Sequence, residues 1–89
     1  MARSYTIVEK SQNRSFSIGA GWWFVLQGKF DEMAMLAFAD KEGTVELQDK
    51  TLQPVTVADT QVRNGVLSVK LDGVDGQKVA RQAKLTLGE

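Results

Sequence analysis

The chain has 89 residues, enough for one domain with one modest hydrophobic core. Its 11 basic and 11 acidic residues cancel, so we expect neither a general nucleic-acid binder nor a polybasic membrane-surface module. The absence of cysteine and histidine excludes a disulfide-stapled scaffold, a cysteine nucleophile and the usual zinc, copper and iron sites. We therefore expect no cofactor and no metal.

The N-terminal residues turn polar at Glu9 and contain no apolar core of a signal peptide. The longest apolar run, Gly19–Leu26, is far shorter than the ~20 residues that a membrane span requires. These features predict a protein made in a cytoplasm, with no signal peptide and no transmembrane segment.

The N-terminal section reads as short strands of alternating apolar and polar residues. A strand over Arg3–Glu9 is followed by a polar connection over Lys10–Ser15. Phe16 and Ile18 alternate with serines and indicate a half-buried strand. The glycine-rich stretch Gly19–Gly21 predicts a bulge or a sharp bend.

The strongest strand signal is Trp22–Phe30, which contains both tryptophans of the chain. Neighbouring side chains on a strand point to opposite faces of the sheet, so the two indoles are separated. We expect one face to enter the core and the other to form a mixed surface that a partner could cover. The core face would hold Trp22, Phe24, Leu26 and Phe30, and the other face Trp23, Val25, Gln27 and Lys29.

The next segment, Met33–Ala39, is predicted to be a second strand, joined to the first by a hairpin around the acidic pair before it. A two-residue loop and a loop one residue longer place its side chains on opposite faces. We prefer the longer loop, because it collects bulky groups such as Phe38 on the side of Trp22. A short helix over Asp31–Asp40 is the alternative, since Glu, Met, Ala and Leu favour helices.

The second half of the chain continues the pattern. Pro54 suits the start of an edge strand, and Asn64-Gly65 is the clearest hairpin-turn signal. The last strand should point Ala83, Leu85 and Leu87 inward. Strands are expected over Thr44–Gln48, Val55–Val57, Val66–Leu71 and Ala80–Leu87, with turns at Lys41–Gly43, Asp49-Lys50, Asn64-Gly65 and Asp72–Gly76.

This spacing predicts an all-β protein of seven to eight short strands, as an antiparallel β-sandwich or jelly-roll-like fold. A small β-barrel is the alternative. Residues 1–15 are expected to form an N-terminal arm with a possible first strand, and residues 16–89 a single β-sandwich domain.

Catalysis is not expected. No histidine can activate a serine, and no serine lies in a nucleophile elbow. Carboxylates such as Asp31 and Glu32 fall at turns, where water should surround them. Asp72 and Asp75 lack the ligand density of a calcium loop. The basic residues are scattered rather than interleaved with aromatics, which argues against a single-strand nucleic-acid surface.

Three roles are open for Trp23. Its indole could stack on a sugar ring, bury apolar area in a protein–protein contact, or be covered within the monomer. Among the binding roles we favour the protein contact, because sugar sites usually add further aromatics. Tyr5, the single tyrosine, is the only other amphipathic aromatic.

The pattern from Trp22 to Leu87 resembles small β-sandwich structural proteins of tailed bacteriophages, of the decoration or accessory kind. It consists of W-x-F-x-L-x-G-x-F at Trp22–Phe30, the turns Asp40–Gly43 and Asn64-Gly65, Val69-x-Leu71-x-Gly73, and a closing Leu85-Thr86-Leu87.

The resemblance implies a non-enzymatic virion component, assembled in the host cytoplasm, that self-associates and docks on a capsid or other virion protein. Such proteins commonly use an N-terminal arm, so Arg3–Glu9 could bind by strand addition. The predicted partner-binding residues are therefore Trp23, Val25, Tyr5 and Ile7. A carbohydrate-binding host-adsorption module and a phage-encoded inhibitor of a host protein are the alternatives.

Overall fold

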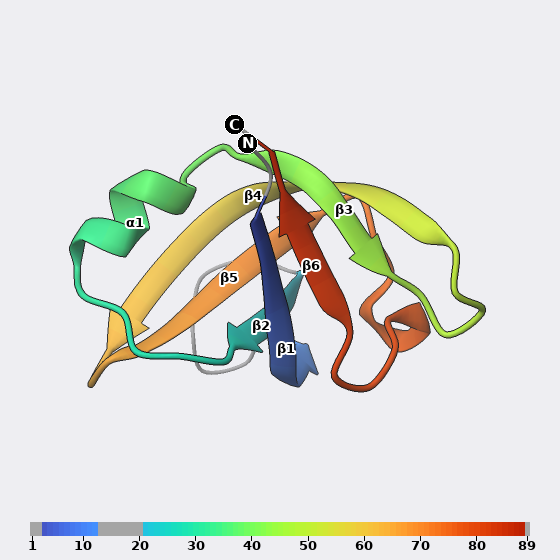
Figure 1. Ribbon diagram of the computed structural model, residues 1–89, viewed down its shortest axis with the longest axis horizontal. Helices are drawn as coiled ribbons and strands as arrows, with labels where there is room; N and C mark the ends of the chain where they lie inside the picture. The colour runs from blue at the N-terminus through green and yellow to red at the C-terminus, as the bar shows by residue number, and fades with distance from the viewer. Residues whose placement is uncertain (1–2, 13–20, 89) are drawn as a thin grey trace.

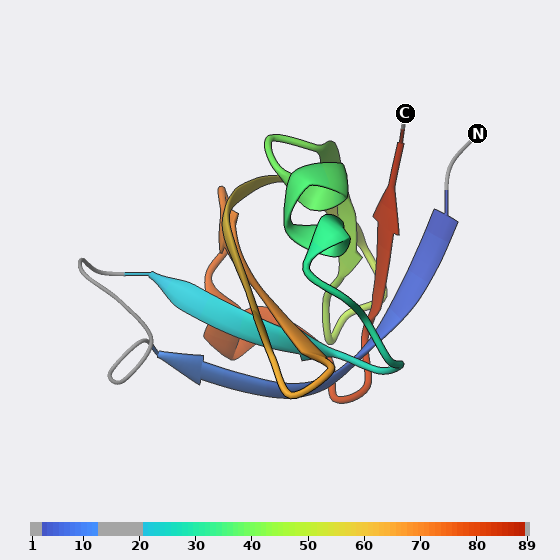
Figure 2. The same ribbon diagram turned by 90° about the vertical axis from the view of Figure 1, so that its left-hand side faces the viewer.

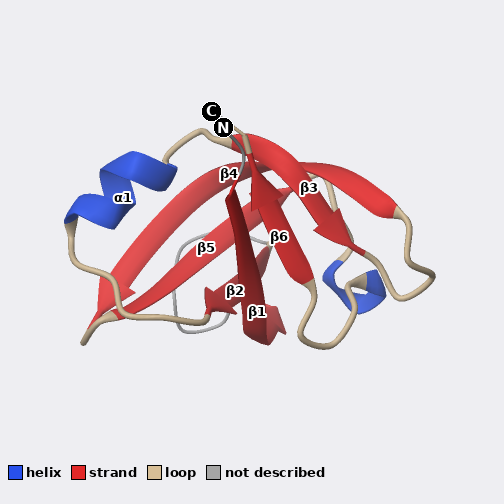
Figure 3. Ribbon diagram, viewed as in Figure 1, coloured by secondary structure: helices blue, strands red, loops and turns tan. Residues whose placement is uncertain are grey.

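The computed structural model describes residues 3–12 and 21–88, and over these residues the chain forms a closed barrel of six strands (Figures 1 and 3). The order around the barrel is β1-β2-β5-β4-β3-β6, and each neighbouring pair is antiparallel. The elements are β1 (Arg3–Gln12), β2 (Trp22–Leu26), helix α1 (Met33–Phe38), β3 (Glu42–Glu46), β4 (Leu52–Arg63), β5 (Val66–Asp72), the 3₁₀ turn η1 (Gly76–Lys78) and β6 (Lys84–Leu87).

The prediction of an all-β fold is confirmed, in its small-barrel form rather than as a sandwich. Strand β6 pairs with both β1 and β3, so the sheet closes on itself. The inside–outside alternation of side chains is the same in a barrel and in a sandwich, and the sequence pattern therefore does not separate the two. Six strands replace the expected seven to eight over the described residues, because one predicted strand is a helix.

The core fills the barrel with aliphatic side chains and phenylalanine. Phe24 lies opposite Val69, and Leu26 opposite Leu67, in the β2–β5 ladder. The expected inward residues of the last strand, Ala83, Leu85 and Leu87, are all buried. The buried cluster also contains Ile7, Phe38, Val45, Val55, Val57, Leu71 and Val79.

Within the expected N-terminal arm, Arg3–Gln12 form an integral barrel strand. Strand β1 pairs with β6 over Arg3–Thr6 and with β2 from Ile7 to Gln12. The segment is thus built into the barrel by one ladder in each half, and the residues from Lys10 to Gln12 belong to a strand rather than a connection. The predicted strand around Phe16 and Ile18 lies outside the described residues.

The prediction of a strand at Met33–Ala39 is wrong, and the helical alternative is the one observed. Residues with high helix propensity form α1, and the Asp31 carboxylate accepts a hydrogen bond of 3.0 Å from the Met33 amide. The preceding strand ends at Leu26. The Gly28 backbone then takes a φ of +130°, and the Phe30 amide donates to the Gly65 carbonyl at 2.9 Å.

Other boundaries differ in smaller ways. The expected turn at Lys41–Gly43 is already strand from Glu42, and the last strand begins at Lys84. The turn at Asn64-Gly65 is confirmed, with positive φ at both residues, as a type I′ hairpin turn requires. Pro54 lies where β4 pairs with β3 alone, which agrees with its missing amide donor.

The barrel closes along β6, which we call the seam. Its four residues lie between β1 and β3, and Figure 2 shows β1 and β6 running side by side. Gly43 faces Leu87 across the seam, and a Cβ at Gly43 would overlap the Thr86 carbonyl oxygen. Only glycine allows the two backbones to approach this closely.

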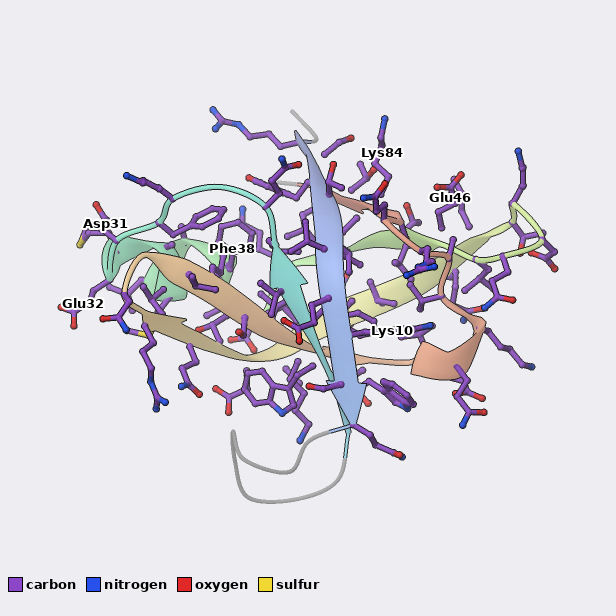
Figure 4. All side chains as sticks on the ribbon, turned by 90° about the horizontal axis from the view of Figure 1, so that it is seen from below. Lys10, Asp31, Glu32, Phe38, Glu46 and Lys84 are labelled. Atoms are coloured by element: carbon purple, nitrogen blue, oxygen red, sulfur yellow. The ribbon has the colours of Figure 1, made fainter. Side chains whose placement is uncertain are left out.

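The barrel end near η1 is closed by Trp22 and Lys10. A Cβ at Gly76 would overlap the Trp22 indole, so the ring packs directly on the backbone of η1. The Lys10 ammonium donates to the carbonyls of Gly76 and Val79 at 2.7 and 2.9 Å, and its side chain extends towards η1 in Figure 4. One lysine thus ties β1 to the connection that precedes β6.

Replacing Gly43 with alanine tests the seam. Gly43→Ala should destabilise the fold by about 3 kcal/mol, the upper end of the cost of overpacking, because the overlapping atoms are backbone. Gly88→Ala is the control, since its Cβ would meet only the Glu42 carbonyl at an ordinary 3.8 Å. Urea unfolding of both variants measures the difference, and equal stabilities would contradict the proposed close approach.

Replacing Lys10 with methionine tests the tie to η1. Lys10→Met keeps the apolar stem but removes the donor from two carbonyls, so we expect a loss of about 1–3 kcal/mol. Lys84→Met, at an exposed position, should change stability by no more than about 0.5 kcal/mol. Thermal and urea unfolding compare the pair, and a Lys10 variant as stable as the Lys84 variant would refute the tie.

Candidate functional site

The two tryptophans face opposite sides of β2, and both are packed. Trp22 contacts the core, whereas Trp23 lies on the outer face, opposite Ser11 of β1 and Lys70 of β5. The side chain of Trp23 is only 1% exposed. Its indole therefore offers no open face to a sugar ring or to a partner, in agreement with the alternative in which both faces are covered within the monomer.

The other predicted contact residues do not join Trp23 in one surface. Ile7 is buried in the core. Val25 lies beside Trp23 and lines a shallow hollow with Gln61 and Val66 on the outer face of the barrel. Tyr5 is half-buried, and its ring lies 5.0 Å from that of Phe38, under α1. The four residues are thus distributed over the core, one outer face and one end of the barrel.

Helix α1 carries the most exposed large apolar side chains of the described residues. Met33 and Leu36 are 68% and 76% exposed, and Ala37 is also exposed. Positions i, i+3 and i+4 lie on one side of a helix, so these three residues form one surface, which we call the α1 face. The acidic residues Asp31 and Glu32 precede it at the outer edge of the molecule (Figure 4).

The opposite side of α1 is fixed to the barrel. Phe38 is buried, and its ring packs edge to face with that of Phe30, with 6.0 Å between the ring centroids. The Thr60 hydroxyl donates to the Met35 carbonyl at 3.3 Å. Past the helix, the Val57 amide donates to the Lys41 carbonyl at 2.8 Å. These contacts orient α1 so that its second apolar side points to solvent.

A small pocket adjoins the α1 face at its C-terminal end. It lies between the start of β1, the end of β6, the end of α1 and Lys41, which follows the helix. The volume of this terminal pocket is about 170 Å³. The apolar residues Phe38 and Leu87 line it together with Tyr5, and Arg3 and Lys41 are its charged lining residues. Ala37 belongs to both the pocket and the α1 face.

The carboxylates of the described residues were checked for clusters and for unusual environments. No group of three or more potential metal ligands occurs within residues 3–12 and 21–88. The Asp75 carboxylate accepts a hydrogen bond from the Gln77 amide, as a turn residue does. Hydrogen bonds from the Thr51 hydroxyl and amide hold the pKa of Asp49 below its usual value, so this carboxylate also belongs to a turn.

No helix in the described part of the chain is long and apolar enough to cross a membrane.

The chain matches no protein-family model, and comparisons with curated proteins and with solved structures find no relative of it. The site must therefore be interpreted from its own geometry.

Sequence reasoning missed both the α1 face and the terminal pocket. The helix propensity of Met33–Phe38 was a usable signal, since a helix places Met33 and Leu36 together whereas a strand separates them. The pocket carried no such signal. Arg3 and Lys41 are far apart in the sequence, and only closure of the barrel brings them to the same cavity.

Alanine substitution of each tryptophan tests the revised assignment. Trp23→Ala should cost about 3–5 kcal/mol in unfolding free energy, as expected for a buried indole, instead of mainly affecting association. Trp22→Ala should also destabilise the fold, by loosening the contact with η1. Chemical denaturation monitored by circular dichroism gives both values. A Trp23 variant with native stability would restore the interpretation of this residue as a contact surface.

Proposed function

We propose that the protein is a non-enzymatic binding protein that acts through protein–protein contacts, with the α1 face as its contact surface. The main support is that Met33 and Leu36 are both exposed on the same side of α1, while the other side of the helix packs on the barrel. Removing such a side chain from water stabilises an interface by roughly 1.5–3 kcal/mol. Two of them form a compact apolar patch, and the cores of interfaces are depleted in charged residues and enriched in methionine.

The partner in this proposal is a shell protein of a virion. The resemblance of Trp22–Leu87 to decoration proteins of tailed phages supports this setting, and the zero net charge is compatible with docking on a protein lattice. Because β1 is built into the barrel between β6 and β2, the α1 face takes the role first expected of an N-terminal arm. Self-association through the same surface is an alternative outcome of the test below.

The Leu36→Glu variant tests this function. A charge at this exposed position should leave the unfolding free energy within about 0.5 kcal/mol of the wild type. It should lower binding to capsid shells encoded in the same genome by at least about tenfold, because a carboxylate would be buried without a partner. Cosedimentation with purified shells measures the effect, and sedimentation velocity without shells reports self-association.

Leu52→Glu provides the matched control. Leu52 is 63% exposed, and β4 begins at the end of the molecule away from α1 (Figure 1). Its substitution should leave shell binding unchanged. Equal loss of binding in both variants, or a wild-type protein that stays monomeric and ignores the shells, would overturn the proposal.

A further inference from the structure

We propose that the terminal pocket binds a carboxylate and an apolar side chain carried by the same residue, as at the C-terminal end of a partner polypeptide. This inference rests on the proposed function, in which the adjoining α1 face docks on a protein. It adds a second, chemically distinct part to that contact surface.

The basic residues of the pocket favour the binding of an anionic group. Arg3 and Lys41 are its charged lining residues, and no acidic side chain lines it among the described residues. Neither cation forms an ion pair within the described ranges, so both are available to a ligand. A guanidinium can hold a carboxylate through two parallel hydrogen bonds, and an ammonium adds a further charge-assisted bond.

The apolar lining and the size of the pocket indicate which apolar group of the ligand would fit. Tyr5, Phe38 and Leu87 present carbon atoms to the cavity, and its volume of about 170 Å³ is close to that of a cavity that holds one benzene ring. One leucine or phenylalanine side chain would fill it. The cations and the apolar floor share so small a cavity that a single residue must supply both groups. A C-terminal residue does so, because its main-chain carboxylate lies two bonds from its Cβ.

Continuity with the α1 face identifies the occupant as protein rather than a free metabolite. Ala37 lies at the boundary between the pocket and the exposed Leu36. A polypeptide that places its last side chain in the pocket would therefore run directly over the α1 face. Capture of a terminal carboxylate is an established mode of peptide recognition.

The experiment uses N-acetyl-L-phenylalanine as the probe and two-dimensional amide NMR spectra of the full chain as the readout. We expect saturable shifts at the amides of Phe38, Lys41 and Gly88, with a Kd on the order of 1 mM, typical of so small a ligand. The neutral N-acetyl-L-phenylalaninamide should bind at least about fivefold more weakly, since it lacks the carboxylate. N-acetylglycine, which lacks the ring, should bind no better than the amide.

Variants locate the binding. Arg3→Gln and Lys41→Gln should each weaken binding of N-acetyl-L-phenylalanine severalfold, and together they should abolish it, with the rest of the spectrum unchanged. Lys84→Gln is the control, because Lys84 is an exposed cation outside the pocket, directed away from the barrel in Figure 4. A chain that lacks Glu89 tests whether the chain's own last residue competes with the probe. Binding at least tenfold tighter to this shortened chain would mean that the chain's own end occupies the pocket, and would overturn the proposal.

The remaining outcomes separate this inference from the proposed function. Equal affinity for the acid and the amide, or affinity unaffected by loss of both cations, would overturn the carboxylate site. Shell binding that still depends on Leu36 would then leave the protein-docking role intact. Conversely, carboxylate binding at the pocket, together with shell binding indifferent to Leu36→Glu, would keep the site and remove the α1 face from the function.

Discussion

The structure depends on the pairing of β6 with two strands at once. β6 is only four residues long, yet it pairs with β1 on one side and β3 on the other, and so turns an open sheet into a barrel. The close approach at Gly43 makes the second pairing possible. Without it the sheet would have two free edges, and exposed edges invite pairing with other chains. Closure along this short seam therefore determines the shape of the sheet and pairs both of its edges.

The exposed helix follows from the same closure. β4 has twelve residues and β3 has five, so β4 extends well past the end of its neighbour. Beyond the irregularity between Val57 and Asp59, the side of β4 away from β5 lies next to α1 instead of a strand. The Thr60 and Val57 hydrogen bonds hold the helix there. A short helix cannot bury two sides against one strand edge, and its second apolar side remains in water.

Sequence reasoning succeeded where the signal is local. The alternation of Trp22, Phe24 and Leu26, and the Asn64-Gly65 turn, depend on backbone geometry within a few residues. It failed where tertiary contacts decide. A six-residue apolar segment is compatible with a strand or a helix, and the helix is the form in which Phe38 reaches the core beside Tyr5 and Phe30. The burial of Trp23 and the presence of Arg3 and Lys41 in one pocket depend on which distant segments the barrel brings together.

The seam and the terminal pocket are energetically connected. The pocket is lined by the first residues of β1, the end of β6, the end of α1 and Lys41 just before β3, and β6 is the strand that joins β1 to β3. A ligand that contacts all of them binds only the closed barrel, and it therefore stabilises the folded chain by mass action. The stabilisation acts on the shortest ladders of the sheet, where β6 has four partners in β1 and three in β3. Docking at this end would thus strengthen the barrel where its own hydrogen bonding is weakest.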